Sequence, residues 1–416
     1  MSNTDKKSIK ALSDQLYKAS KSIRVLTAIN WNVKVKEAFF KSKAQKLPKV
    51  SYPKFDANPA LVEIKNARKL IPSGSSFENW GTRIADNLEN SAMLLATLGS
   101  PDFFLFSKIL YGSPEKLLPD GETTTLDLAN HFERMYDNID RLGIEPDNIP
   151  EFSAQELVDK MTEPVLKMFG KNAPKILLSK SVSSKVIAGR TKITVRSTAT
   201  FSDRDISQLL NHEAYIHVAT AINGHAQTNL RILSAAYPGT TKMQEGLAVF
   251  AEFISGNIDL DRLRRLSDRV VAIQMAIDGA DFIEVYRYYE TRSVNIDQAF
   301  ENTRRVFRGG VITGKAPFTK DIVYLEGLLK VHNFLRVVVS AGRADVLPLL
   351  FVGKLDLQDI GDMIAFKKLG LLKDPKYLPP WMTDIRFLVT YLSYSSFLNS
   401  VKLDKLRGLY EGMIQE

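Results

Sequence analysis

The sequence contains no cysteine and only 5 histidines among its 416 residues. Without cysteine, the chain can form no disulfide and has no thiolate chemistry. The longest apolar runs, residues 346–352 and 385–398, are too short or too polar to span a bilayer, so we expect no membrane insertion. Neither a phosphate-binding glycine loop nor a Gly-x-Ser-x-Gly nucleophile elbow occurs. These absences exclude disulfide-stabilised domains, thiol enzymes, membrane-spanning chains and serine hydrolases of the elbow type.

The charge of the chain is concentrated near its start. The net charge is +9, and residues 1–50 contain 11 lysines and 1 arginine against 3 acidic residues. This stretch is a candidate surface for an acidic partner, and the alternative is a solvated, partly helical surface. No nucleic-acid-binding motif accompanies it, so we expect no nucleic-acid partner. Residues 1–14 are polar and contain no apolar signal segment, which favours a cytoplasmic location.

Two histidines lie five residues apart in residues 212–217, which read His-Glu-Ala-Tyr-Ile-His. Ser202 and Asp205 form the pattern of a capping box, so a helix is predicted to begin after Ser202. On an ideal α-helix the two rings would point about 140° apart and could not reach one ion. A π-type turn would bring His212 and His217 onto one face. The alternative is a surface helix with two unrelated histidines.

A carboxylate on the next predicted helix completes a metal-ligand set. Residues 244–248 read Gln-Glu-Gly-Leu-Ala and follow a turn at Pro238. Glu245 would give two histidines and one glutamate, a set that binds zinc and leaves its fourth position open. Glu252 shares a helix face with Glu245, and Glu252 or Asn223 could orient a ligand histidine. For Glu252 the alternative is a solvated helix face.

The remaining site candidates follow from what peptide hydrolysis requires. Glu213, next to ligand His212, is the candidate general base. Tyr324 is the candidate donor to the oxyanion of the tetrahedral intermediate, with His225 and Arg231 behind it. A C-terminal carboxylate would need a cation, and arginine suits its geometry best. The candidate substrate-binding residues are Arg231, Arg305, Arg308 and Lys320. For each of them the alternative is a surface charge.

These residues together resemble the QEGLA-motif proteins, known in bacteria as flavohaemoglobin expression-modulating proteins. Residues 244–248 are the signature of that family. The family is similar to the tyrosine metallocarboxypeptidases that remove the C-terminal tyrosine of tubulin. Those enzymes carry a His-Glu-x-x-x-His zinc helix and a later ligand glutamate, matched here by His212, Glu213, His217 and Glu245. The resemblance implies Zn²⁺ at these residues and a peptide or protein C-terminus as substrate.

Proline-rich stretches at residues 47–59, 145–152 and 372–380 predict connections between mostly helical segments. Residues 185–200 are the exception and read as a β-hairpin just before the zinc helix. We therefore predict a mostly helical α+β fold with a zincin-like metallopeptidase core. A small sheet lies beside the zinc helix, with additional N- and C-terminal helices. The predicted division is an N-terminal helical region with a basic start, residues 1–150, and the zinc metallopeptidase core with the C-terminal helices, residues 151–416.

The predicted function is a zinc-dependent peptidase, and the resemblance specifies a metallocarboxypeptidase. One alternative is a non-enzymatic regulator on the same fold, in which the metal is structural or absent. Another is an acidic-partner binding module built on residues 1–50. The intact Glu213 favours the enzyme, because a structural zinc has no use for a general base.

Overall fold

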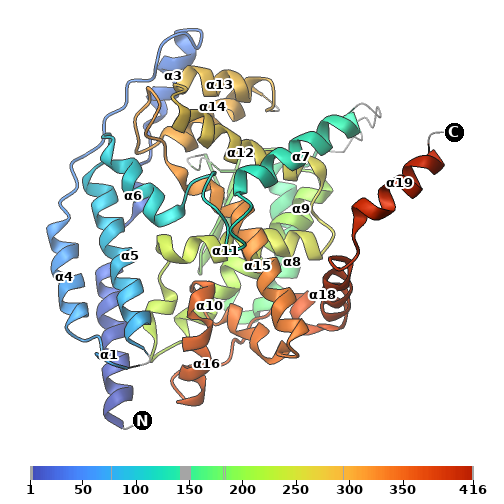
Figure 1. Ribbon diagram of the computed structural model, residues 1–416. Helices are drawn as coiled ribbons and strands as arrows, with labels where there is room; N and C mark the ends of the chain where they lie inside the picture. The colour runs from blue at the N-terminus through green and yellow to red at the C-terminus, as the bar shows by residue number, and fades with distance from the viewer. Residues whose placement is uncertain are drawn as a thin grey trace.

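The computed structural model describes residues 3–75, 77–140, 151–180, 182, 184–293 and 295–414. In this part of the chain most residues lie in helices, and a single three-stranded sheet is present (Figure 1). The predicted mostly helical α+β class is confirmed. Most of the proline-rich connection predicted at residues 145–152 lies outside the described residues. Among the described helices, none combines the length and the apolar character needed to cross a membrane.

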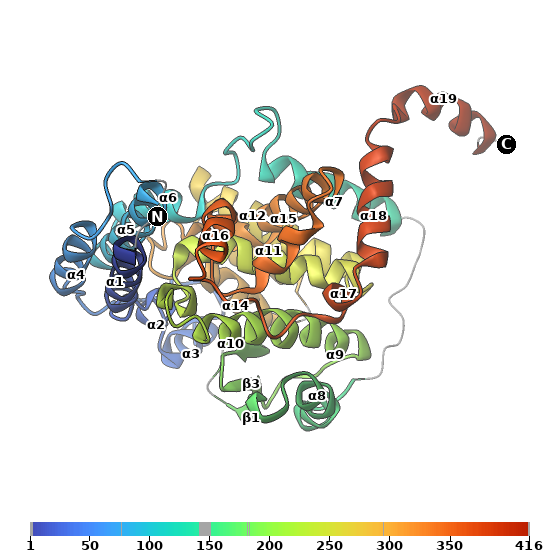
Figure 2. The same cartoon turned by 90° about the horizontal axis from the view of Figure 1, so that it is seen from below.

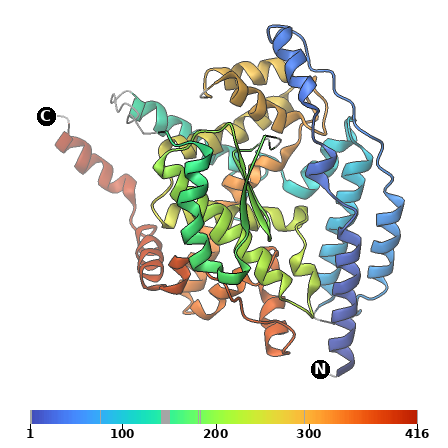
Figure 3. The same ribbon diagram turned by 180° about the vertical axis from the view of Figure 1, so that it is seen from behind.

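Several of the N-terminal helices form one side of the molecule. Figures 1 and 3 show α1, α4 and α5 side by side along this edge. The helices of this region are α1 (Asn3–Ser20), α2 (Val25–Ala28), α3 (Val33–Lys41), α4 (Asn58–Arg68), α5 (Glu78–Ala96), α6 (Asp102–Tyr111) and α7 (Thr125–Asp140). Buried side chains of α1 and α5, such as Leu12 and Trp80, share one hydrophobic cluster with Phe250 and Leu328 from later helices, whereas α3 and α7 pack into a second cluster with α12 (Leu260–Asp278), α13 (Phe282–Glu290) and α14 (Ile296–Phe307). The division predicted at residue 150 therefore crosses a continuous core, and it stays a prediction.

Two helices cross at the centre of the molecule, α11 (Pro238–Ile254) and α15 (Val323–Ser340). They meet at Gly246 and Gly327, where a Cβ built on Gly246 would lie 2.2 Å from the backbone carbon of Gly327. Only glycine permits this close approach of two backbones. Since Gly246 follows Glu245 directly, the crossing also fixes the position of that carboxylate.

Gly246→Ala is expected to destabilise the protein by about 3 kcal/mol, because overpacking against a rigid backbone forces the two helices apart. Gly361→Ala is the matched control. Gly361 lies in helix α16 (Ile360–Lys368), and a Cβ there meets nothing within 4 Å. That variant should be slightly stabilised, since alanine favours the helix over glycine. Denaturant unfolding of both variants tests the difference, and equal stabilities would show that the crossing tolerates a side chain.

The small sheet lies beneath the predicted zinc helix (Figure 2). Its strands are β1 (Lys175–Ser179), β2 (Val186–Ala188) and β3 (Lys192–Arg196), in the order β1-β3-β2. β2 and β3 are antiparallel, as the predicted hairpin requires, whereas β1 pairs parallel to β3 and was not predicted. Ile193 and Val195 are fully buried between α8 (Ala154–Phe169) and Ala214 and Val218 of the helix above. The sheet therefore supports the helix on one side.

The remaining helices surround this centre. Aromatic packing joins α3 to later helices, with the Phe39 ring 5.3 Å from that of Phe282 and 5.4 Å from that of Phe300. Figure 2 shows α19 projecting away from the rest of the molecule. The further elements are η1 (Gly170–Asn172), η3 (Arg231–Ser234), α12 (Leu260–Asp278), α13 (Phe282–Glu290), α14 (Ile296–Phe307), η4 (Thr319–Ile322), η5 (Ala344–Phe351), η6 (Leu357–Asp359), α17 (Pro380–Thr383), α18 (Arg386–Leu398) and α19 (Leu403–Ile414).

Candidate metal centre

The helix that carries the two histidines changes its winding along its length. It begins as α9 (Asp203–Leu209), whose capping box is the predicted one: Ser202 Oγ accepts from the Asp205 backbone N–H, and the Asp205 carboxylate accepts from that of Ser202. The next nine residues form the π-helix η2 (Leu210–Val218), and α10 (Ala219–His225) completes the helix. The predicted π-type turn is confirmed. It places the His212 and His217 rings on one face, with their centroids 4.9 Å apart.

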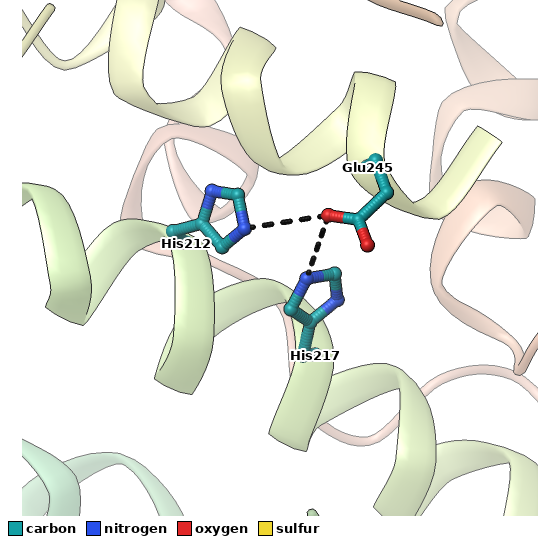
Figure 4. Close-up of side chains that lie close together, drawn as sticks. All are labelled: His212, His217 and Glu245. Carbon is teal, nitrogen blue, oxygen red and sulfur yellow. Dashed lines mark ion pairs between the residues drawn. The ribbon is translucent and has the colours of Figure 1, made fainter. Parts of the chain in front are cut away.

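Glu245 reaches this face from α11 (Figure 4). Its Oε2 lies 3.5 Å from His212 Nε2 and 3.5 Å from His217 Nε2, and the three ligand atoms all lie within 4.8 Å of one another. Tetrahedral zinc with bonds of about 2.0–2.2 Å holds its ligand atoms about 3.3–3.6 Å apart. The three residues therefore fit a zinc ion. Their side chains are 9–16% exposed.

Glu252 lies behind the first histidine. Its Oε1 is 2.6 Å from His212 Nδ1, and the Arg262 Nε and Nη2 atoms donate to its two oxygens at 2.9 Å each. The side chain is fully buried, so the alternative of a solvated helix face is wrong. Burial alone would raise the pKa of Glu252, but Arg262 and His212 lower it to about 2. The ionised carboxylate can only accept, so Nδ1 carries a proton, and Nε2 is the ring nitrogen that faces the centre and is available to a metal ion.

The centre stabilises positive charge. Burial alone would lower the pKa of His212, but hydrogen bonds to Glu245 and Glu252, together with the charges of Glu252 and Glu213, raise it to about 10. Burial likewise opposes ionisation of Glu245, yet Lys320 and the two histidines hold its pKa well below the ordinary value. The carboxylates around His212 therefore favour a positive charge at this position.

Asn223 has a different role from the predicted one. Its Nδ2 donates to the carbonyls of Phe351 and Tyr377, and its Oδ1 accepts from the backbone N–H groups of Lys376 and Tyr377. These four bonds use the whole hydrogen-bonding capacity of the amide, so none is left for a histidine ring. Asn223 instead fastens the helix to the segment before α17. The prediction that it orients a ligand is corrected accordingly.

Two of the candidate substrate-binding residues lie beside the centre, together with Tyr324. Lys320 Nζ lies 3.7 Å from Glu245 Oε1 and 3.7 Å from Asp321 Oδ1. Arg305 forms a bidentate pair with Asp321 and donates from Nη2 to the Tyr324 hydroxyl at 3.3 Å. Arg305 therefore already has a carboxylate partner in Asp321, and it also donates to the Tyr324 hydroxyl. Neither Arg305 nor Lys320 is a solvated surface charge.

Arg308 is buried, with 8% of its surface exposed, but it lacks such a partner. Within the described ranges no carboxylate lies within 4 Å of its guanidinium, and its buried Nε has no hydrogen-bond acceptor. Burial lowers its pKa to about 10, with Arg305 adding to the effect. A buried, unpaired guanidinium is costly and is available to a carboxylate from outside the chain.

Arg231 and His225 lie away from the three ligands. The Arg231 guanidinium stacks over the Tyr17 ring at 4.7 Å and lies 3.7 Å from Asp14, both on α1. Arg231, His225 and Tyr17 line a cavity of about 150 Å³ whose lining includes none of the three ligands. For Arg231 the surface-charge alternative is therefore the better description.

The sequence prediction missed two arginines on α12. Arg262 holds Glu252, and the Arg269 guanidinium stacks over the Tyr324 ring at 4.6 Å. Arg262, Arg265 and Arg269 are spaced i, i+3 and i+7, so their positions on one helix face could have indicated a cationic surface.

The sequence model of the microtubule-associated tyrosine carboxypeptidase family matches residues 37–400, a range that includes every residue of the candidate centre. No curated protein matches the chain. The family match covers well over half of the sequence and confirms the similarity to the tyrosine carboxypeptidases that residues 212–217 and 244–248 indicated. The chain belongs to the microtubule-associated tyrosine carboxypeptidase family.

Proposed function

We propose that this protein is a zinc-dependent metallocarboxypeptidase, which removes one or a few C-terminal residues from a peptide or protein. One arrangement supports the proposal above all: Glu245 Oε2 lies 3.5 Å from both His212 Nε2 and His217 Nε2, with Glu252 behind the first ring. The description of the family names tyrosine as the residue released. A peptide that ends in tyrosine is therefore the first substrate to test.

Glu213 is the proposed general base. Bound zinc would lower the pKa of water and polarise the scissile carbonyl. Glu213 directly follows His212 on the π-helix. Its negative charge favours the protonated forms of both His212 and Lys354. It is thus near the centre, where it can take a proton from the attacking water and pass it to the leaving amine. The Tyr324 hydroxyl, oriented by Arg305, is the proposed donor to the oxyanion.

Arg308 is the proposed partner of the substrate's C-terminal carboxylate, because it is a buried guanidinium that pairs with no carboxylate in the described part of the chain. Arg308→Ala is expected to lower kcat/KM for free-acid peptides by about tenfold to hundredfold, the value of a lost charge-assisted hydrogen bond. Peptides with an amidated C-terminus should change much less. Arg231→Ala removes a half-exposed arginine from outside the centre and is the matched control. Equal losses on free-acid and amidated peptides would contradict this role for Arg308.

The enzyme and its non-enzymatic alternative differ in one experiment. The zinc-loaded protein is incubated with paired peptides that end in tyrosine, one as the free acid and one as the amide, and the products are identified by mass spectrometry. We expect loss of the terminal residue from the free acid only. Equal cleavage of both would leave a peptidase but contradict the carboxypeptidase assignment. No cleavage of any peptide would favour a regulator on this fold.

A further inference from the structure

A buried lysine lies behind the candidate centre, between the two helices that carry the candidate ligands. Lys354 follows η5, and 9% of its surface is exposed. Its ammonium donates to Gln244 Oε1 at 2.6 Å, to Thr220 Oγ1 at 2.9 Å and to the His217 carbonyl at 3.3 Å. These are three acceptors for its three donors, so the hydrogen-bonding capacity of the ammonium is fully used.

The contact between Lys354 and the His217 carbonyl lies at the end of the π-helix. His217 is the second candidate ligand, and the winding changes from π to α between Val218 and Ala219. The His217 carbonyl has two side-chain donors within reach, Lys354 Nζ and Thr220 Oγ1, each at 3.3 Å. Lys354 therefore binds the backbone of a ligand residue where the helix is least regular.

The contact between Lys354 and Gln244 lies on the other ligand-bearing helix. Gln244 directly precedes Glu245 on α11, and its Oε1 accepts from Lys354 and lies 2.8 Å from Thr220 Oγ1. A single ammonium thus joins the helix of His217 to the helix of Glu245. On the first helix it binds the backbone of His217 itself, and on the second it binds Gln244, the residue before Glu245. The distance between His217 Nε2 and Glu245 Oε2 depends on this relation between the two helices.

The loop that carries the lysine is itself fixed. The Lys354 backbone N–H donates to the Leu233 carbonyl at 2.7 Å, and a Cβ on the preceding Gly353 would lie 3.1 Å from the Gly224 Cα. Among the described residues no carboxylate lies within 4 Å of the ammonium, so it is held by neutral acceptors alone. Burying an ammonium without an ion pair costs stability, which argues for a role other than stabilising the fold.

We propose that Lys354 is a positioning residue for metal binding: it holds the His217 turn against α11 so that His217 and Glu245 can bind one ion. This inference rests on the proposed zinc site. Partners that orient metal ligands typically contribute about tenfold to hundredfold to metal affinity.

The test measures zinc affinity of the full chain by competition with a chromophoric chelator. Lys354→Met keeps the length of the side chain and removes its donors, and it is expected to weaken zinc binding by about tenfold to hundredfold. The visible spectrum of the cobalt-loaded variant should differ from that of the wild type, because the ligand geometry changes. Gln244→Leu removes the acceptor on α11 and should weaken binding in the same direction.

Lys242→Met is the matched control. Lys242 is a partly buried lysine on the same helix as Glu245, with 19% of its side chain exposed, and it pairs with Glu326 at 2.7 Å. Its loss should lower the melting temperature and leave zinc affinity within about twofold of the wild type, since the pair does not touch a ligand.

The outcomes separate this inference from the function on which it rests. A wild-type protein that binds no zinc would overturn the proposed site itself. Wild-type zinc binding with unchanged affinity in Lys354→Met would overturn the inference alone, as would a loss no greater than that of Lys242→Met. If Lys354→Met does not fold, Gln244→Leu and Thr220→Val decide, and wild-type affinity in both of them contradicts the inference.

Discussion

Glu213→Gln is expected to lower kcat by about a hundredfold to ten-thousandfold while the protein keeps its fold and its zinc. The amide has nearly the shape of the carboxylate but cannot accept a proton from water. His212, His217 and Glu245 stay intact in this variant, so metal binding should not change. The measurement is the steady-state cleavage of a free-acid peptide, together with the zinc content of the same preparation.

The Glu213→Gln result also distinguishes the role of a general base from that of a substrate-binding residue. An enzyme with Glu213 as general base loses activity on every substrate by a similar factor. By contrast, Arg308→Ala should produce losses that depend on the C-terminal group of the substrate. Full activity in Glu213→Gln would contradict the proposed mechanism, whatever metal the protein holds.

His217→Ala is expected to remove both the metal and the activity. Two remaining protein ligands, His212 and Glu245, cannot hold zinc as three do, so the zinc content should fall from about one per chain to nearly none. The side chain of His217 is 16% exposed and faces the centre, so the fold should survive its loss. Elemental analysis of the purified variant measures the change.

His225→Ala is the matched control for His217→Ala. His225 ends the same helix but is exposed and lines the cavity with Tyr17 and Arg231. This variant should keep both zinc and activity. Equal zinc contents in the two variants would contradict the assignment of His217 as a ligand.

The parts of the centre that could be predicted from sequence are those fixed by neighbouring residues. The capping box at Ser202 and Asp205 predicted where the helix begins, because both partners lie within one turn. The five-residue spacing of His212 and His217 predicted the π-helix, since only a wider turn brings both rings to one face.

The parts that could not be predicted depend on packing between distant segments. Lys354 lies 137 residues from His217 in the chain, and β1 joins the hairpin by a parallel pairing that no local pattern indicates. Asn223 shows the opposite error: its place near the helix end suggested a role at the centre, but its amide binds residues more than 120 positions later. Spacing along the chain gives no information about such contacts.

The cations show the same limit. Arg305 and Arg308 are three residues apart and have the same chemistry, so no local pattern distinguishes them. In the folded protein Asp321 pairs with Arg305, and Arg308 stays buried without a carboxylate. Only the fold determines which guanidinium is available to a substrate.

The most direct test of the proposed centre is a crystal structure of the zinc-loaded protein with anomalous data collected at the zinc absorption edge. We predict one strong anomalous peak, at about 2.0–2.2 Å from His212 Nε2, His217 Nε2 and Glu245 Oε2. The helix from Leu210 to Val218 should keep its π-helical winding around that ion. A peak at other residues, or no peak between these three side chains in a zinc-saturated crystal, would contradict the proposed zinc site.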